Sequence, residues 1–411
     1  MSNPKDAFPH ELLRRPPKER LHYFVSKVVA HPHLTEAYQA LLNLIDHPCG
    51  ATLAVVCGPT GAGKTTLRLR TEQQLIKAAQ AEMARDLRHV PVASLEVSPP
   101  DGQSFSWKDL YRRMLVALHE PPMLIVQKRL AQSGMSGTTH QPQSPTSSAS
   151  SIPAAAQTRS SLDLRWAVER SVRERRPAAI LIDEAQHLNR VMGARTLQQQ
   201  MDVLKSLASA TGVLHVLIGT YELLNMINLS AQLARRSVEI HFPRYRADNP
   251  HDMVMFTNVV FTFERHLPLA KMPDLVAQRD FLYEGSAGCV GTLKDWLTRA
   301  YKRALDGGSP TLTRQHLERS LDRRKQMQIV REILEGEEAL RASSQTQQLR
   351  SLLGMDLLNP APSAENTSTG VKRTMPTNAD GSTRMRSQRS RSRRAGQRLP
   401  KRDPVGKKAD Q

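Results

Sequence analysis

The segment that most restricts how this chain can fold is Gly58–Thr65, with the sequence GPTGAGKT. It fits the pattern G-x-x-x-x-G-K-[ST] without a mismatch, and it follows Ala51–Cys57, an apolar and β-branched run typical of a buried strand. Glycines let such a loop curl so that backbone N–H groups point at phosphate oxygens, and a helix that begins at its end places its positive end under the anion. The sequence therefore predicts a strand, a phosphate-binding loop and a helix.

Within this loop, Lys64 is expected to reach the β- and γ-phosphates of ATP, and Thr65 to offer its hydroxyl to Mg²⁺. The residues predicted to hold the nucleotide are Gly58, Pro59, Thr60, Gly61, Ala62, Gly63, Lys64, Thr65 and Thr66.

A second apolar run, Pro177–Glu184, ends in two carboxylates. We expect Asp183, at the tip of a strand, to hold Mg²⁺ through its water shell, and Glu184 to polarise the attacking water. A helix N-cap with an acidic first turn has the same residue types. The position of the pair downstream of the phosphate-binding loop favours catalysis.

Three further features have both a functional and an ordinary interpretation. Thr220 follows the predicted strand Val213–Gly219, so it either positions the γ-phosphate or water, or simply leaves the strand in a turn. Arg235 and Arg236 end a predicted helix, so one of them is either an arginine finger acting in trans or a cation at a helix C-terminus. Lys294 either contacts the phosphates from a helical lid or is a solvated lysine.

The order of the elements predicts an α/β class. Strands at 51–57, 90–97, 178–182, 213–219 and 238–242 alternate with helices at 64–86, 107–119, 162–176, 197–208 and 223–236. Such alternation implies a parallel sheet covered by helices on both faces. After Pro243 the periodicity is helical only, at 253–266, 274–283, 291–305 and 312–335, which predicts a small all-helical lid.

These elements divide the chain into four regions. An N-terminal arm with lead-in helices covers 1–46, with a helix break at His31-Pro32, and the nucleotide-binding core covers 47–245. The lid covers 246–340 and a polar to basic tail covers 341–411. Thirteen of the thirty residues at 132–161 are Ser or Thr, so we expect a disordered insertion there, and the tail to be disordered from about residue 360.

The charge of the chain indicates a polyanionic partner. Its formal net charge is +19, and residues 371–411 hold 13 Lys/Arg against 3 Asp/Glu, a net of +10, which leaves 19 − 10 = +9 for the remainder. Lys108, Arg112 and Arg113 are candidates for contact with DNA phosphates. No apolar run approaches a membrane span, and the three scattered cysteines form no CxxC pair, so we expect neither a membrane nor a zinc site, and a reducing cytoplasm.

Taken in order, GPTGAGKTT, ILIDEAQHL, VLIGTYELL, QLARR and GCVGTLKDWLTRA resemble the AAA+ ATPases of the TniB/TnsC type, which regulate DNA transposition. The resemblance covers about residues 20–310. It implies an ATP-hydrolysing α/β core with a helical lid, assembly of subunits on double-stranded DNA as a ring or helical filament, recruitment of transposase and communication with a target-selection protein. It also places Lys294 at the lid-side sensor position and the arginine finger at Arg235 or Arg236.

Three other functions remain open from the sequence. Secretion ATPases of the ExeA type share the DEAQ segment, and an initiator-like DNA loader would share the core and the basic charge. An ATP-gated scaffold that barely hydrolyses is the third, although the presence of Glu184 argues against it. The basic charge favours the functions that involve DNA over secretion.

Overall fold

The computed structural model of the chain describes residues 8–99, 105–119, 160–189, 194–228, 236–343 and 353. The chain divides into two compact units, Met1–Thr346 and Gln347–Gln411. Leu353 alone represents the second unit among the described residues, so the fold reported below is that of the first unit.

A parallel sheet of five strands, in the order β2-β3-β4-β1-β5, forms the centre of this unit. Its strands are β1 (Leu53–Cys57), β2 (Val92–Glu96), β3 (Ala179–Asp183), β4 (Leu214–Gly219) and β5 (Ser237–His241). Val55 on β1 is paired with Leu217 on β4 and with Glu239 on β5, so β1 lies between them. Because all strands run the same way, the residues that follow them gather at one edge of the sheet.

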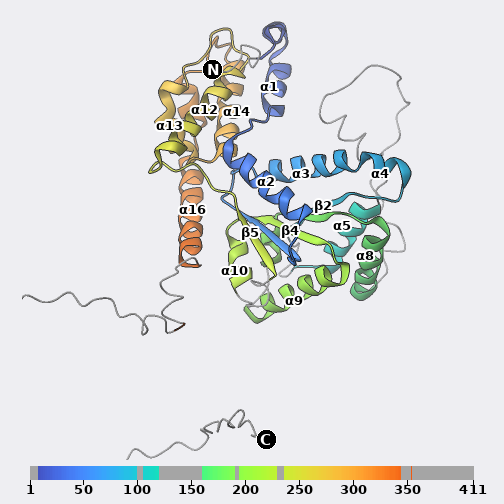
Figure 1. Cartoon of the computed structure of the whole chain (residues 1–411). Helices are drawn as coiled ribbons and strands as arrows, with labels where there is room; N and C mark the ends of the chain where they lie inside the picture. Colours follow the sequence, from blue (N-terminus) through green and yellow to red (C-terminus); the bar gives the residue numbers. More distant parts are fainter. Residues whose placement is uncertain are drawn as a thin grey trace, which may run out of the picture. The chain divides into compact units, whose positions relative to one another are not determined.

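Helices cover both faces of the sheet, as the alternation of strands and helices predicted (Figure 1). Ala54 and Val56 of β1 belong to a core with α2 (Pro32–Asp46) and α3 (Lys64–Ala78). Leu53, Val55 and Cys57 belong to a second core on the other face. The helices of this second face are α5 (Trp107–His119), α8 (Ser161–Arg175), α9 (Ala194–Thr211) and α10 (Glu222–Asn228). The predicted α/β fold with a helix-covered parallel sheet is confirmed.

A separate apolar core joins the helices after residue 249. These are α12 (Pro250–Arg265), η4 (Val276–Gln278), α13 (Arg279–Ser286), α14 (Val290–Asp306) and α15 (Arg314–Ser320). The N-terminal helix α1 (Pro17–Ser26), which follows η2 (His10–Arg14), packs here through Phe24, whose ring meets those of Phe263 and Tyr301 edge-on. Helix α1 therefore belongs to the helical segment and not to the sheet core.

Several predicted helix boundaries differ from the observed ones. The single helix expected at 64–86 is two helices, α3 and α4 (Gln80–Arg85), and the one expected at 312–335 is α15 followed by α16 (Arg323–Ser343). The second break has a local cause, because Leu321 is extended and the Asp322 carboxylate accepts hydrogen bonds from the backbone of Arg324 and Lys325, which starts a new helix.

The predicted insertion, tail and N-terminal helix break have different outcomes. Ser160 and Ser161, placed by the sequence in the insertion 132–161, instead form the N-cap and first residue of α8, in a capping box with Asp163. The rest of that insertion, and the basic tail apart from its first residues in α16 and Leu353, lie outside the described ranges. The break predicted at His31-Pro32 is confirmed, since His31 is extended and Pro32 is the first residue of α2.

Among the helices of the described residues, none has both the length and the apolar character that crossing a membrane requires.

Candidate functional site

The loop after β1 has the curled backbone that the sequence predicted. Gly61 and Gly63 have φ angles of 79° and 113°, a region that glycine enters without strain. Lys64 follows as the first residue of α3 and is 8% exposed, and its Nζ donates to the carbonyl oxygens of Gly58 at 3.0 Å and Pro59 at 2.8 Å. Burial lowers the pKa of Lys64, and the carboxylate of Glu184 opposes that shift. The ammonium group therefore points back into the curl of its own loop.

Asp183, at the tip of β3, has both carboxylate oxygens engaged. One accepts from the backbone N–H of Glu184 at 3.0 Å, and the other accepts from Nε of Arg68 at 2.9 Å. Arg68 lies one helical turn after Lys64 and also donates to Oγ of Ser94 at 2.6 Å. The side chain of Asp183 is 2% exposed, so this ion pair ties the tip of β3 firmly to α3.

Glu184 adopts a left-handed conformation with a φ of 54°, which costs a non-glycine residue free energy and is common at functional sites. Its carboxylate accepts from Nε2 of Gln186 at 2.5 Å, while Oε1 of Gln186 accepts from the backbone N–H of Thr220 at 3.3 Å. Gln186 therefore bridges the tips of β3 and β4. The Thr220 hydroxyl is buried and has no hydrogen-bond partner among the described residues.

The helical segment closes the other side of the loop. The backbone N–H of Gly291, in the first turn of α14, donates to the Gly61 carbonyl at 2.7 Å. Lys294 lies on the same helix, but its Nζ donates to the Val25 carbonyl of α1 at 2.7 Å. The structure thus directs Lys294 at α1 and not at the phosphate-binding loop, and its role as a lid-side sensor stays a prediction.

The predicted arginine finger and DNA contacts concern the segment before β5 and helix α5. Arg235 is outside them, and Arg236 is exposed just before β5, where its carbonyl accepts from the backbone of Leu53. On α5, Lys108, Arg112 and Arg113 are partly buried, and Arg113 pairs with Asp109 at 2.7 Å. The arginine finger and the DNA contacts therefore also stay predictions.

Two residues of the site had not been singled out from the sequence. Arg68 is four positions after Lys64, so helical periodicity places it on the same side of α3, and Gln186 belongs to the DEAQ segment. Arg68 is recognisable only once α3 is known to lie beside the tip of β3, and Gln186 only once the tips of β3 and β4 are known to be close in space.

The residues present suit a cation that arrives with a nucleotide. Within the described ranges, no group of three or more His, Cys, Asp or Glu side chains is arranged to hold a metal by itself. Thr65 at the start of α3 and Asp183 at the tip of β3 are one hydroxyl and one carboxylate, which suits Mg²⁺ because this ion keeps several waters and takes phosphate oxygens as ligands.

Comparison with known proteins agrees with this geometry. Residues 46–227, somewhat less than half of the chain, match the family model described as AAA domain. This segment contains the phosphate-binding loop, the Asp183–Glu184 pair and Thr220. No curated protein matches the sequence.

Solved structures similar to the chain include the Aeropyrum pernix ORC2 protein, with 15% identity and a TM-score of 0.41 over 70% of this chain and 66% of that one. A Walker-type ATPase of Pyrococcus abyssi has 14% identity and a TM-score of 0.40 over 75% of each chain. Cdc6p from Pyrobaculum aerophilum has 14% identity and a TM-score of 0.40 over 71% of this chain and 67% of that one. The match spans just under two thirds of the Aeropyrum protein.

Proposed function

We propose that the chain is an ATPase that assembles on double-stranded DNA in its ATP-bound state and regulates transposition by recruiting a transposase. The observation that carries the ATPase assignment is the meeting of Lys64, Glu184 and Thr220 at one edge of the sheet. Their side chains come from three different segments, and Gln186 connects two of them.

The phosphate-binding loop supplies binding. Lys64 would give up its hydrogen bonds to the two loop carbonyls and contact the β- and γ-phosphates instead. The first turn of α3 would stabilise the negative charge of the phosphates. Thr65 and Asp183 would hold Mg²⁺, which neutralises charge on the phosphates when it is bound. Arg68 keeps the Asp183 carboxylate in place at the tip of β3.

The tips of β3 and β4 supply the activation of water. The Glu184 carboxylate would accept a proton from water that attacks the γ-phosphate, and Gln186 holds that carboxylate from the side. The unpaired Thr220 hydroxyl is available to orient the water or a γ-phosphate oxygen. An arginine from a second copy of the chain, Arg235 or Arg236, would complete the site in trans, which makes oligomers part of the proposal.

The DNA and transposition parts rest on charge and on the resemblance to the TniB/TnsC type. A net charge of +19 suits a partner with a dense negative charge. The resemblance in the DEAQHL, VLIGT and ARR segments favours a transposition regulator, with transposase and a target-selection protein as partners.

Binding to duplex DNA across a salt series, with and without a non-hydrolysable ATP analogue, tests this function. If about six or more phosphates are contacted, affinity should fall by ~10³ or more between roughly 50 and 200 mM salt, because binding releases counterions. Electron micrographs of the same mixtures should show rings or filaments only with the analogue. ATP turnover without any binding to DNA would instead support the secretion alternative.

A further inference from the structure

Helix α16 (Arg323–Ser343) brings an acidic side chain to the phosphate-binding loop. The Thr60 hydroxyl donates to both carboxylate oxygens of Glu332, at 2.8 Å and 3.1 Å, across 272 positions of the chain. Thr60 belongs to the loop predicted to hold phosphates. A fixed negative charge at this point opposes the binding of another anion.

One face of α16 packs against the AAA domain beside α10 (Figure 1). Ile333 is 2% exposed, and Leu340 packs against the sheet core on the α10 side. Between them, Gly336 lies against the ring of Tyr221, the residue after Thr220, so closely that an added Cβ would be 2.1 Å from a ring carbon. Tyr221 is itself buried and its hydroxyl is 3.0 Å from Nε2 of His241. The helix can therefore occupy this position only with a glycine at 336.

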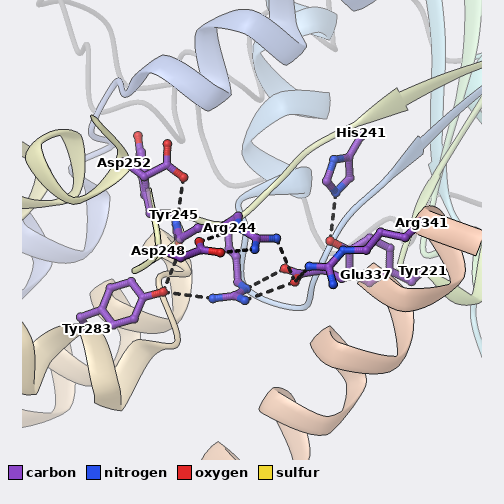
Figure 2. A network of polar contacts seen from close by, with 10 residues as sticks. Tyr221, His241, Arg244, Tyr245, Asp248, Asp252, Tyr283, Glu337 and Arg341 are labelled. Carbon is purple, nitrogen blue, oxygen red and sulfur yellow. Dashed lines mark hydrogen bonds and ion pairs between the residues drawn. The ribbon is translucent and has the colours of Figure 1, made fainter. Parts of the chain in front are cut away.

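A second contact anchors the same face through charge (Figure 2). The Glu337 carboxylate pairs with Arg244 at 2.7 Å and with Arg246 at 3.6 Å, both in the segment after β5. Arg244 also donates to the Tyr283 hydroxyl of α13 at 3.0 Å. The side chains of Glu337 and Arg244 are 11% and 16% exposed, so this pair holds better than a surface pair.

The two kinds of contact have different consequences. Gly336 and Glu337 dock the helix without touching the predicted phosphate site, while Glu332 reaches into that site. Glu332 is also near enough to Lys64 for its charge to act on the ammonium group. Residues 336–337 thus fix α16 in place, and the Glu332 carboxylate, one helical turn earlier, covers the loop at Thr60.

We propose that α16 is an autoinhibitory latch, in which the Glu332 carboxylate occupies the phosphate-binding loop at Thr60 and must leave before nucleotide phosphates bind fully. This inference rests on the proposed nucleotide-binding function and adds its regulation. Only molecules with an open latch bind nucleotide fully. The apparent affinity for nucleotide is therefore the affinity of the open form multiplied by the fraction of molecules that are open.

Two variants open the latch by independent means. Glu332→Gln removes the charge but keeps an oxygen that can accept from Thr60, and Gly336→Ala pushes the helix off Tyr221 while increasing its helix propensity. Glu338→Gln is the matched control, because Glu338 is an exposed carboxylate on the same helix. Equilibrium binding of a fluorescent ATP analogue to the full chain should be about 3- to 10-fold tighter in both opening variants and unchanged in the control.

Hydrogen exchange gives a readout that does not depend on affinity. Saturating ATP analogue should increase exchange in residues 323–343 of the wild-type chain, and Gly336→Ala should show that increase without nucleotide. Lys64→Ala combined with Gly336→Ala should abolish the gained affinity, which ties the gain to the loop.

The outcomes separate the latch from the function on which it rests. If the wild type binds nucleotide while Glu332→Gln and Gly336→Ala bind equally or more weakly, or if nucleotide protects α16 from exchange, the latch is wrong and α16 belongs to the bound state. If neither the wild type nor any folded variant binds nucleotide, the nucleotide assignment is wrong and the latch falls with it.

Discussion

The phosphate-binding loop has two sides that are built differently. On the sheet side, the tips of β3 and β4 and helix α3 hold Asp183, Arg68 and Gln186 in a partly buried network of hydrogen bonds. On the helical side, α14 and α16 contact the loop through Gly291 and Glu332, and the Glu332 contact is with an exposed hydroxyl. The first side lies within the residues that match the AAA domain model, and the second comes from residues after them.

The two sides of the loop differ in how easily they can move. The sheet side cannot rearrange without breaking buried pairs or the pairing of β3 with β4, whereas α16 leaves by giving up one packed face and a few ion pairs. Regions with fewer buried contacts open at lower free energy than the core does. Under the proposed function, the residues that must keep fixed positions for catalysis are therefore those on the sheet side, and those that respond to nucleotide are those on the helical side.

The largest effect is expected from Glu184→Gln on the sheet side. The substitution removes the carboxylate that accepts a proton from water but keeps the size of the side chain, so turnover should fall by about 10²- to 10⁴-fold while ATP binding persists. Steady-state phosphate release and equilibrium binding of a fluorescent ATP analogue measure the two quantities. Lys64→Ala is the companion variant, and it should lose binding itself.

Turnover above one tenth of the wild-type rate in Glu184→Gln would remove Glu184 from its catalytic role. Wild-type affinity in Lys64→Ala would show that the loop does not hold the phosphates. Either result would mean that ATP is bound or hydrolysed by other residues. The assignment of catalysis to the sheet side of the loop would then be wrong.

The next largest effect concerns the buried pair of Arg68 and Asp183. Arg68→Gln leaves a carboxylate with 2% exposure without its cation, which should lower the free energy of unfolding by about 3–5 kcal/mol. Urea denaturation measures this change. Lys302→Gln is the control, because Lys302 and Asp306 are about 60% exposed and their pair should contribute less than ~0.5 kcal/mol. Equal effects of the two variants would mean that the sheet side is no more rigid than the surface.

The sheet side was largely predictable from the sequence, because short-range patterns determine it. An apolar run that ends in Asp183–Glu184 and a glycine loop after β1 each specify a local structure, and parallel strands bring their ends together. The contact of Arg68 with Asp183 was not predicted, since it depends on which strand lies beside α3.

The helical side was not predictable in the same way. The contact between Thr60 and Glu332 joins positions far apart in the sequence, and no periodicity in α16 marks Glu332 as different from Glu335 or Glu338. The helix itself was expected, but as part of one continuous helix at 312–335. The break at Leu321–Asp322 changes the course of the chain before Glu332, and its signal, an Asp at an N-cap, is too common to be decisive alone.

A smaller effect is expected from Gly291→Ala, which tests how closely α14 approaches the loop. A Cβ at this position would be 2.6 Å from the Gly61 carbonyl oxygen, so α14 or the loop must shift, at a cost of about 1–3 kcal/mol, despite the higher helix propensity of alanine. Thermal unfolding measures the cost. Gly307→Ala, at the other end of α14, meets nothing nearer than 3.3 Å and is the control. A Gly291→Ala protein more stable than the wild type would show that the helical side tolerates looser contact than proposed.

The smallest effect is a dependence of stability on pH that arises where the lead-in segment meets the residues after β5. Burial, together with the charges of His33 and Arg70, lowers the pKa of His31 from 6.5 to about 4, and its Nδ1 lies 3.1 Å from the Tyr245 hydroxyl. Between these two pKa values the unfolded chain binds a proton that the folded chain does not. Stability is therefore fully present above about pH 6.5 and falls as the pH is lowered toward 4.

His31→Asn should reduce this loss by ~1 kcal/mol between about pH 6.5 and 5.5, measured by urea denaturation at each pH. His215 is also buried, with its pKa lowered to about 4, so part of the slope should remain in the variant. An identical slope in His31→Asn and the wild type would show that the folded chain accommodates a charged His31.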